Sequence, residues 1–420
     1  MSSIVKNLQF YKFSLYGFFK NLKFFEPFLI LFFLDKGLSY TQIGVLYAIR
    51  EISINLLEIP TGVMADLLGR KRTMIASFVS YIASFLIFYL FSEFWVFILA
   101  MLAFSFGDAF RTGTHKAMIF EYLKLNNWQN QKVAYYGHTR SWSQIGSAVS
   151  SLIAAGIVIY TGNYSAVFLW AMLPYLADLL LIASYPQELD GKIRNNTTTL
   201  REKFVEIKTG IRISFKNRLF FKLIGNLAIF EGLFKASKDY LQPMVVLTFM
   251  AIPFLDDVST ETKSAVTLGL IYFLVYLITS YASRNSGWVV DKLGSTHRAI
   301  NLTLWLGALV GIGSGFLIGF RMPVLALVVF VFLFFIQNIR KPVGVAAVAD
   351  TFDEKVLATG LSVQSQFDSL FASLFALVLG VLADYTSVGN ALIVASSVLL
   401  LLSIFVRLPH AEVLNEPTSH

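Results

Sequence analysis

The chain has 420 residues, of which 56% are hydrophobic and 14% are charged, whereas soluble globular proteins carry about 25% charged residues. This composition excludes an ordinary soluble protein and indicates an integral membrane protein. The chain contains no cysteine, which excludes disulfides, thiolate metal ligands and thiol nucleophiles.

Apolar stretches recur along the whole chain, each about as long as the 20 residues that an α-helix needs to cross the hydrocarbon core. We therefore predict an all-α membrane protein with twelve membrane-spanning helices. Lys20, Lys23 and Glu26 interrupt the first stretch, so it does not read as a cleavable signal peptide. In chain order, the predicted spans are 11–34, 41–64, 73–92, 95–120, 134–160, 165–185, 220–250, 265–289, 299–320, 323–346, 359–384 and 387–406.

The net charge of +8 is concentrated in alternate loops. Arg70 and Lys71 follow the second span, Lys292 follows the eighth, and a basic run occupies 192–222. The intervening loops are poor in lysine and arginine, and the positive-inside rule then places both termini and the central loop in the cytoplasm. This distribution gives no support to a nucleic-acid partner.

Residues 186–218 form the only long polar connection and divide the spans six and six. We predict an N-terminal bundle over 1–185, a cytoplasmic linker over 186–218 and a C-terminal bundle over 219–420. Apolar residues recur in the linker at spacings of three and four, from Leu200 to Phe215, among basic residues. This pattern suits an amphipathic helix held at the lipid surface, and it suits a solvated linker helix equally well.

An internal repeat supports the division into two halves. Three sets of residues in the first half match residues in the second, at offsets of 215, 225 and 229. Because the matches keep the same order along the chain, we predict two homologous six-helix bundles. The matched residues are Gly17, Lys20 and Lys23 with Gly232, Lys235 and Lys238; Gly44, Tyr47, Gly62, Asp66 and Gly69 with Gly269, Tyr272, Gly287, Asp291 and Gly294; and Arg111 with Arg340.

The stretch Gly62-Val-Met-Ala-Asp66-Leu-Leu-Gly69-Arg70-Lys71 resembles the G-x-x-x-D-[RK]-x-G-R-[RK] signature of the major facilitator superfamily. A second copy, with Gly287, Asp291 and Gly294, lies after the eighth span, although Leu67 and Ser295 replace basic residues of the pattern. The resemblance implies a cytoplasmic latch that opens during the cycle, whereas the alternative is a turn with positive charges. The gate residues that it implies are Gly62, Asp66, Gly69, Arg70, Lys71, Gly287, Asp291 and Gly294.

Ionisable residues cluster on a few of the predicted spans. A charge at the centre of a membrane helix costs about 2.5 to 3.5 kcal/mol, so such residues normally face a wet cavity or a partner. We expect a substrate pathway or, as the alternative, a structural lattice of ion pairs. The candidates for the pathway are Lys20, Lys23, Glu26, Arg50, Glu51, Asp108, Arg111, His115, Lys235, Lys238 and Arg340, and those for proton coupling are Glu26, Glu51, Glu58 and Asp108. Asp178, in the sixth span, is interpreted as a packing contact.

No phosphate-binding lysine loop, metal-ligand cluster or catalytic triad is recognisable in the sequence, so we expect no enzyme activity, cofactor or metal. The resemblance implies a secondary transporter that works by alternating access, and we expect a monomer in the bacterial inner membrane. We expect protons to drive it, because desolvation and a basic neighbour can tune a carboxylate beside a cavity, such as Glu26, Glu51 or Asp108, into the working pH range. We expect a small polar, anionic or zwitterionic solute. One alternative is a polyspecific drug exporter, because Arg111 to Glu121 resembles the fourth helix of drug/proton antiporters and Phe24, Phe25, Phe110 and Trp142 offer aromatic surface. The other is a membrane sensor that transports nothing.

Overall fold

The computed structural model describes residues 5–112, 114–128, 131–190, 205, 218–250, 259–284, 286–351 and 354–409. These residues form α-helices and short 3₁₀ helices, and none of them forms a strand. Nine helices among them are long and apolar enough to span a membrane. Twelve spans and the side on which the termini lie stay predictions, and the predicted amphipathic helix of the linker lies almost wholly outside the described residues.

The chain folds into two compact units. Unit 1 comprises Met1–Leu38, Ile49–Lys203 and Asp256–Tyr276, and unit 2 comprises Ser39–Ala48, Phe204–Leu255 and Leu277–His420. Each unit thus contains a short segment that comes from the other half of the sequence. The predicted bundle boundaries, 1–185 and 219–420, stay a prediction.

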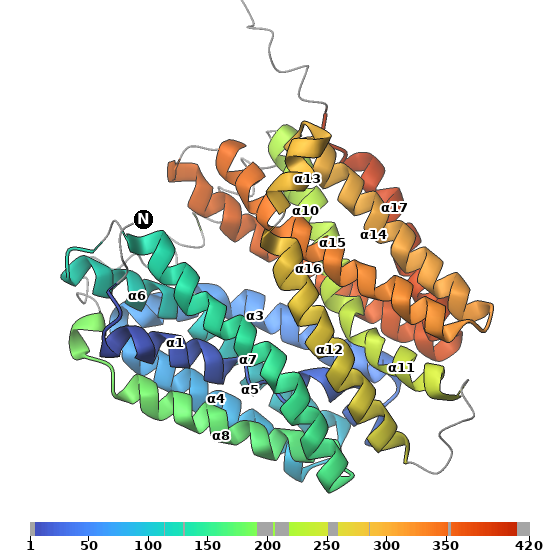
Figure 1. Cartoon of the computed structure of the whole chain (residues 1–420), viewed down its shortest axis with the longest axis horizontal. Helices are drawn as coiled ribbons and strands as arrows, with labels where there is room; N and C mark the ends of the chain where they lie inside the picture. The colour runs from blue at the N-terminus through green and yellow to red at the C-terminus, as the bar shows by residue number, and fades with distance from the viewer. Residues whose placement is uncertain are drawn as a thin grey trace, which may run out of the picture. The chain divides into compact units, whose positions relative to one another are not determined.

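In unit 1, α4 lies between α5 and α8, and α1 packs against α7 and α8 (Figure 1). Its core is rich in aromatic rings, such as Phe32, which contacts Phe88, Phe97 and Phe168. The elements of unit 1 are α1 (Leu8–Lys20), η1 (Glu26–Phe28), α2 (Leu29–Asp35), α3 (Tyr40–Leu68) from residue 49 on, α4 (Arg70–Leu90), α5 (Phe94–Arg111), α6 (Thr114–Leu125), α7 (Lys132–Thr161), α8 (Ala166–Ala183), η3 (Gln187–Asp190) and most of α12 (Thr260–Arg284).

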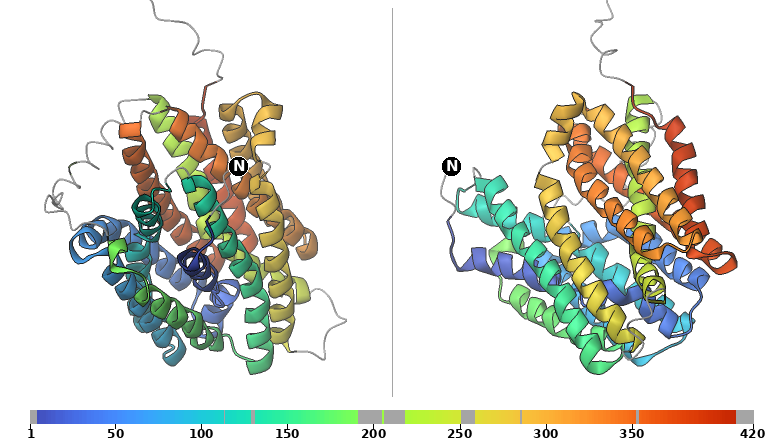
Figure 2. Two further views of the ribbon diagram at one scale, coloured as in Figure 1. Left: turned by 60° about the vertical axis from the view of Figure 1, so that its left-hand side comes forward. Right: turned by 45° about the vertical axis from the view of Figure 1, so that its right-hand side comes forward.

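In unit 2, α10 packs along α16, and α14 packs against α15 and α17 (Figure 2). Its core includes Leu223, Ile300 and Val348, all fully buried. The elements of unit 2 are the start of α3, α10 (Arg218–Ser237), η4 (Lys238–Tyr240), α11 (Leu241–Met250), the end of α12, α13 (Ser286–Leu293), α14 (Thr296–Gly319), α15 (Pro323–Thr351), α16 (Glu354–Tyr385) and α17 (Val388–Phe405).

Two predicted spans are broken in their middle. The span predicted over 11–34 divides into α1, η1 and α2, and the span predicted over 220–250 divides into α10, η4 and α11. A proline follows each break, Pro27 in η1 and Pro243 in the first turn of α11, and proline removes a backbone donor. The first break begins after Lys20 and contains Lys23, and the second begins at Lys238, three residues after Lys235, so the repeated lysines lie at or next to the two breaks.

Two glycines that mark the repeat lie at close helix contacts. A Cβ on Gly44 would lie 2.5 Å from the carbonyl oxygen of Ala376 in α16, and a Cβ on Gly269 would lie 2.6 Å from the Cβ of Ala155 in α7. Asp384, near the end of α16, accepts hydrogen bonds from the first backbone N–H groups of α3, at Tyr40 (2.8 Å) and Thr41 (2.6 Å). The start of α3 is therefore fixed to α16 by close packing and by a carboxylate cap.

Candidate functional site

Lys20 is the last residue of α1 and lies at the break in the first predicted span. The side chain of Asn21 donates to the carbonyl of Gly17 at 2.6 Å, which satisfies one of the oxygens freed where the helix ends. Lys23 follows in the non-helical turn and pairs with Glu26 at 3.9 Å. The chain thus presents three charged side chains where its backbone is interrupted.

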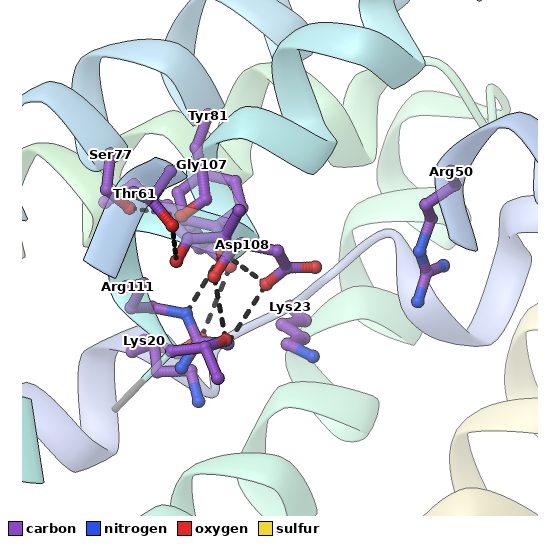
Figure 3. Close-up of polar contacts among 12 residues, drawn as sticks. Lys20, Lys23, Arg50, Thr61, Ser77, Tyr81, Gly107, Asp108 and Arg111 are labelled. Carbon is purple, nitrogen blue, oxygen red and sulfur yellow. Dashed lines mark hydrogen bonds and ion pairs between the residues drawn. The ribbon is translucent and has the colours of Figure 1, made fainter. Parts of the chain in front are cut away.

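Asp108 and Arg111, near the end of α5, form the centre of a polar cluster with Tyr81 of α4 (Figure 3). Arg111 donates from Nη2 to Asp108 Oδ1 at 3.0 Å and from Nε to the Tyr81 hydroxyl at 3.0 Å. The Tyr81 hydroxyl also donates to Asp108. Lys20 and Lys23 lie beside this cluster. Arg111 thus pairs with Asp108 within the cluster.

A pocket of about 150 Å³ opens next to this cluster, within unit 1. Lys20, Arg111, His115 and Lys116 line it together with apolar and hydroxyl side chains, and no carboxylate lines it. Drug-sized ligands occupy pockets of about 300 to 1,000 Å³, so this pocket suits the charged group of a small solute.

The imidazole of His115 is held from two sides. It stacks on the ring of Tyr16 with centroids 3.6 Å apart, and its Nε2 lies 3.1 Å from the hydroxyl of Tyr185. These contacts fix the ring where it lines the pocket.

The remaining candidates of the first half are also engaged. Arg50 lies 3.7 Å from Glu51 and over the ring of Phe104, at 5.5 Å from its centroid. Glu58 lies one helical turn from Thr61, which donates to its backbone carbonyl at 3.1 Å. The assignment of proton coupling to Glu26, Glu51, Glu58 or Asp108 stays a prediction.

In unit 2, the charges at the second break make local pairs. Lys238 lies 3.4 Å from Asp239, whose other carboxylate oxygen accepts a hydrogen bond from Tyr47 at 3.0 Å. Lys235 lies in the last turn of α10, as Lys20 does in α1. That the two lysine pairs face each other stays a prediction.

Arg340 is 2% exposed and is enclosed by helix packing. It donates to the backbone carbonyl of Asn226 at 2.7 Å and to Thr303 at 3.0 Å, and also to Asn226 Oδ1 and to the carbonyl of Ile300. It lies over the ring of Phe230, 4.8 Å from its centroid. The structure therefore places this predicted pathway residue in a network that joins α10, α14 and α15.

The predicted gate is described only in part. Gly62 and Asp66 both fall in α3, but the structure does not describe the side chain of Asp66 or the packing around Gly62. Gly69 and Gly294 have φ angles of 92° and 66°, in the region that favours glycine. A Cβ added at Gly287 would have no heavy atom of another residue within 4 Å, so no close contact requires glycine there. Asp291 lies exposed on α13.

The basic residues of the first gate copy tie elements of unit 1 together. Arg70 lies 3.7 Å from Glu121 of α6, and Lys71 donates to the carbonyl of Tyr185 at 2.8 Å. A latch role for these residues stays a prediction.

The sequence interpretation missed two side chains of the site. Tyr81 bridges Asp108 and Arg111, and nothing in its apolar surroundings marks it. Asp178 is completely buried beside the polar cluster. The signal for Asp178 was present, because it is the only charged residue in the predicted span 165–185.

Comparison with known proteins identifies the family of the chain. The model of the Major Facilitator Superfamily matches residues 14–339. An uncharacterized MFS-type transporter of Bacillus subtilis (strain 168), YxaM, is 25% identical over 256 residues, which are 60% of this chain and 58% of that protein. The aligned part is thus less than two thirds of the relative's length.

Solved structures share the fold at low sequence identity. The nucleoside transporter NupG superposes with a TM-score of 0.75 at 13% identity, covering 95% of this chain and 98% of that one. A POT family transporter in complex with a thioalcohol-conjugated peptide gives a TM-score of 0.71 at 13% identity, covering 95% of each chain.

Proposed function

Since this chain belongs to the major facilitator superfamily, a family of integral membrane transporters, we propose that it is a secondary active transporter of a small polar, anionic or zwitterionic solute. It works by alternating access and uses the proton gradient of the bacterial inner membrane. The solute binds where the first span is broken, as in transporters whose discontinuous helices line a site near the membrane midplane.

The observation that carries this proposal is the pocket at the break. Four basic or imidazole side chains line a space of about 150 Å³, and Asp108, beside the pocket, pairs with Arg111 at 3.0 Å. A negative group of the solute would bind to these cationic side chains. Lys20 makes the best first contact, because its ammonium forms no ion pair or hydrogen bond with any described residue.

Two further observations favour a polar solute over an apolar one. NupG is a nucleoside transporter and the POT family transporter binds a peptide conjugate, so the same fold serves polar solutes. Two of the aromatic residues that suggested drug export, Phe25 and Phe110, are 5% and 2% exposed and do not line the pocket. They lend the alternative little support.

Flux into proteoliposomes tests the proposal. Purified protein would be assayed with a panel of labelled nucleosides, dipeptides and small carboxylates, with and without an imposed pH gradient. We expect gradient-driven accumulation of at least one anionic or zwitterionic solute. Lys20→Gln should weaken the affinity for this solute by about 1.5 to 3 kcal/mol, which is the contribution of a hydrogen bond to a charged group.

Lys124→Gln is the matched control, because Lys124 is an exposed lysine at the end of α6. Uptake of cationic drugs alone, or Lys20→Gln with the affinity of Lys124→Gln, would contradict the proposal.

A further inference from the structure

Asp178 is a buried carboxylate in α8, one of the helices that are long and apolar enough to span a membrane. It is 0% exposed, and neither of its oxygens has a hydrogen-bond partner among the described residues. A buried carboxylate in this position is stable only if a cation balances it or if it carries a proton. Its surroundings therefore decide which of the two holds.

The register of α1 against α8 places Asp178 beside Lys20. Tyr175 donates to the carbonyl of Lys20 at 3.4 Å, and Tyr185 donates to the carbonyl of Lys12 at 3.4 Å. The two helices thus run antiparallel, and Asp178, one turn after Tyr175, lies opposite the last turn of α1.

The other charges of the cluster are already matched. Arg111 is bound to Asp108 and to Tyr81, and Lys23 lies near Glu26. Among the described residues, the side chains of Lys20 and Asp178 remain as a cation and an anion without hydrogen-bond partners. The titratable groups around Asp178 are Lys20 and Tyr16 from α1, Arg111 from α5, Tyr81 from α4, Tyr175 on α8, and Tyr185, which Tyr135 of α7 approaches.

We propose that Asp178 is the coupling acid of the pocket: it balances Lys20 while the pocket is empty and takes up one proton when a compact anion binds Lys20. The anion replaces Asp178 as the counter-charge of the ammonium, and the carboxylate is then left buried without compensation. The proton comes from water and forms an O–H bond on Asp178, so the net charge of the site is the same with one anion and one proton bound as with neither. This inference rests on the proposed function and names its coupling residue.

Proton uptake on anion binding tests the inference directly. Purified protein in detergent, weakly buffered at neutral pH, would receive the sodium salts of acetate, lactate and methanesulfonate, with binding followed by tryptophan fluorescence and protons by an indicator dye. We expect about one proton taken up per bound anion in the wild type. Asp178→Asn should bind the anion and take up none, Asp178→Glu should restore uptake, and Glu93→Gln, an exposed loop acid, should leave uptake unchanged.

Infrared difference spectra provide a second readout. Anion binding should create a protonated carboxyl band in the wild type that shifts in Asp178→Glu and is absent in Asp178→Asn. The inference is overturned if Asp178→Asn still takes up a proton, if the wild type binds an anion without uptake, or if it binds none of the three. Flux separates this result from the proposed function, because a wild type that accumulates a solute yet shows no uptake at Asp178 refutes the inference alone.

Discussion

Replacing Gly44 by alanine should loosen the contact between the start of α3 and α16. The added Cβ would lie 2.5 Å from the carbonyl oxygen of Ala376, whereas ordinary contact begins at 3.4 Å. The helices must therefore separate by roughly 1 Å, and overpacking of this kind costs about 1 to 3 kcal/mol. Alanine recovers up to about 1 kcal/mol because it is a better helix former than glycine.

With about 2 kcal/mol for the overpacking, in the middle of that range, and a gain of up to about 1 kcal/mol in helix propensity, the net loss should be about 1 to 2 kcal/mol. In a domain of 150 to 250 residues, each kcal/mol lowers Tm by roughly 2 to 4 °C, so we expect Gly44→Ala to melt about 2 to 8 °C below the wild type. Scanning fluorimetry of the purified protein in one detergent measures this shift.

Gly156→Ala is the control with the opposite expected sign. Gly156 lies in α7, and a built Cβ there has no heavy atom within 4 Å. Only the gain in helix propensity remains, so its Tm should equal or exceed that of the wild type. The steric reasoning is refuted if Gly44→Ala melts at or above the temperature of Gly156→Ala.

Three further predictions follow, two from described contacts and one from the gate motif in the sequence. Asp384→Ala removes the acceptor of the Tyr40 and Thr41 N–H groups and should destabilise the protein by about 0.5 to 2 kcal/mol; an unchanged Tm would contradict the cap. In Arg340→Lys, a lysine cannot reproduce the several hydrogen bonds that the guanidinium donates, so Tm should fall on the order of 10 °C. Lys341→Gln, at a side chain 61% exposed, should change Tm little. Equal shifts of Tm in the two variants would refute the structural role of Arg340. Asp66→Asn should leave expression near normal but slow flux, and wild-type flux would reject the latch.

Much of the helix layout could be predicted because apolar length is a local property of the chain. The span predicted over 299–320 appears as Thr296–Gly319, and that over 387–406 as Val388–Phe405. The charged pairs at Lys20 and Lys235 were visible as an offset repeat. Their coincidence with breaks in the helices was not predicted, because a break depends on which backbone groups find other partners in the folded protein.

The site could be predicted only in part, because residue type shows where a charge is but not what satisfies it. The clustering of Asp108 and Arg111 followed from their spacing on one helix face, and the structure brings them to 3.0 Å. Arg340 matches Arg111 in the repeat, yet its donors are taken up by Asn226, Ile300 and Thr303, which lie far away in the sequence. Asp178 was underrated for the same reason: only the packing of α8 on α1 gives it a neighbouring cation.

The ends of α1 at Lys20 and of α10 at Ser237 also have an electrostatic consequence. A helix that ends carries a partial negative charge on its last carbonyl groups, equivalent to about half an elementary charge. α1 and α10 each end with a lysine in the last turn, where a cation is stabilised by about 0.3 to 1 kcal/mol at exposed sites and by more when partly buried. The partial charge at the end of α1 thus adds to Asp178 in stabilising the Lys20 ammonium. A solute anion that binds Lys20 would have to compete with both, which lowers its affinity and favours its release.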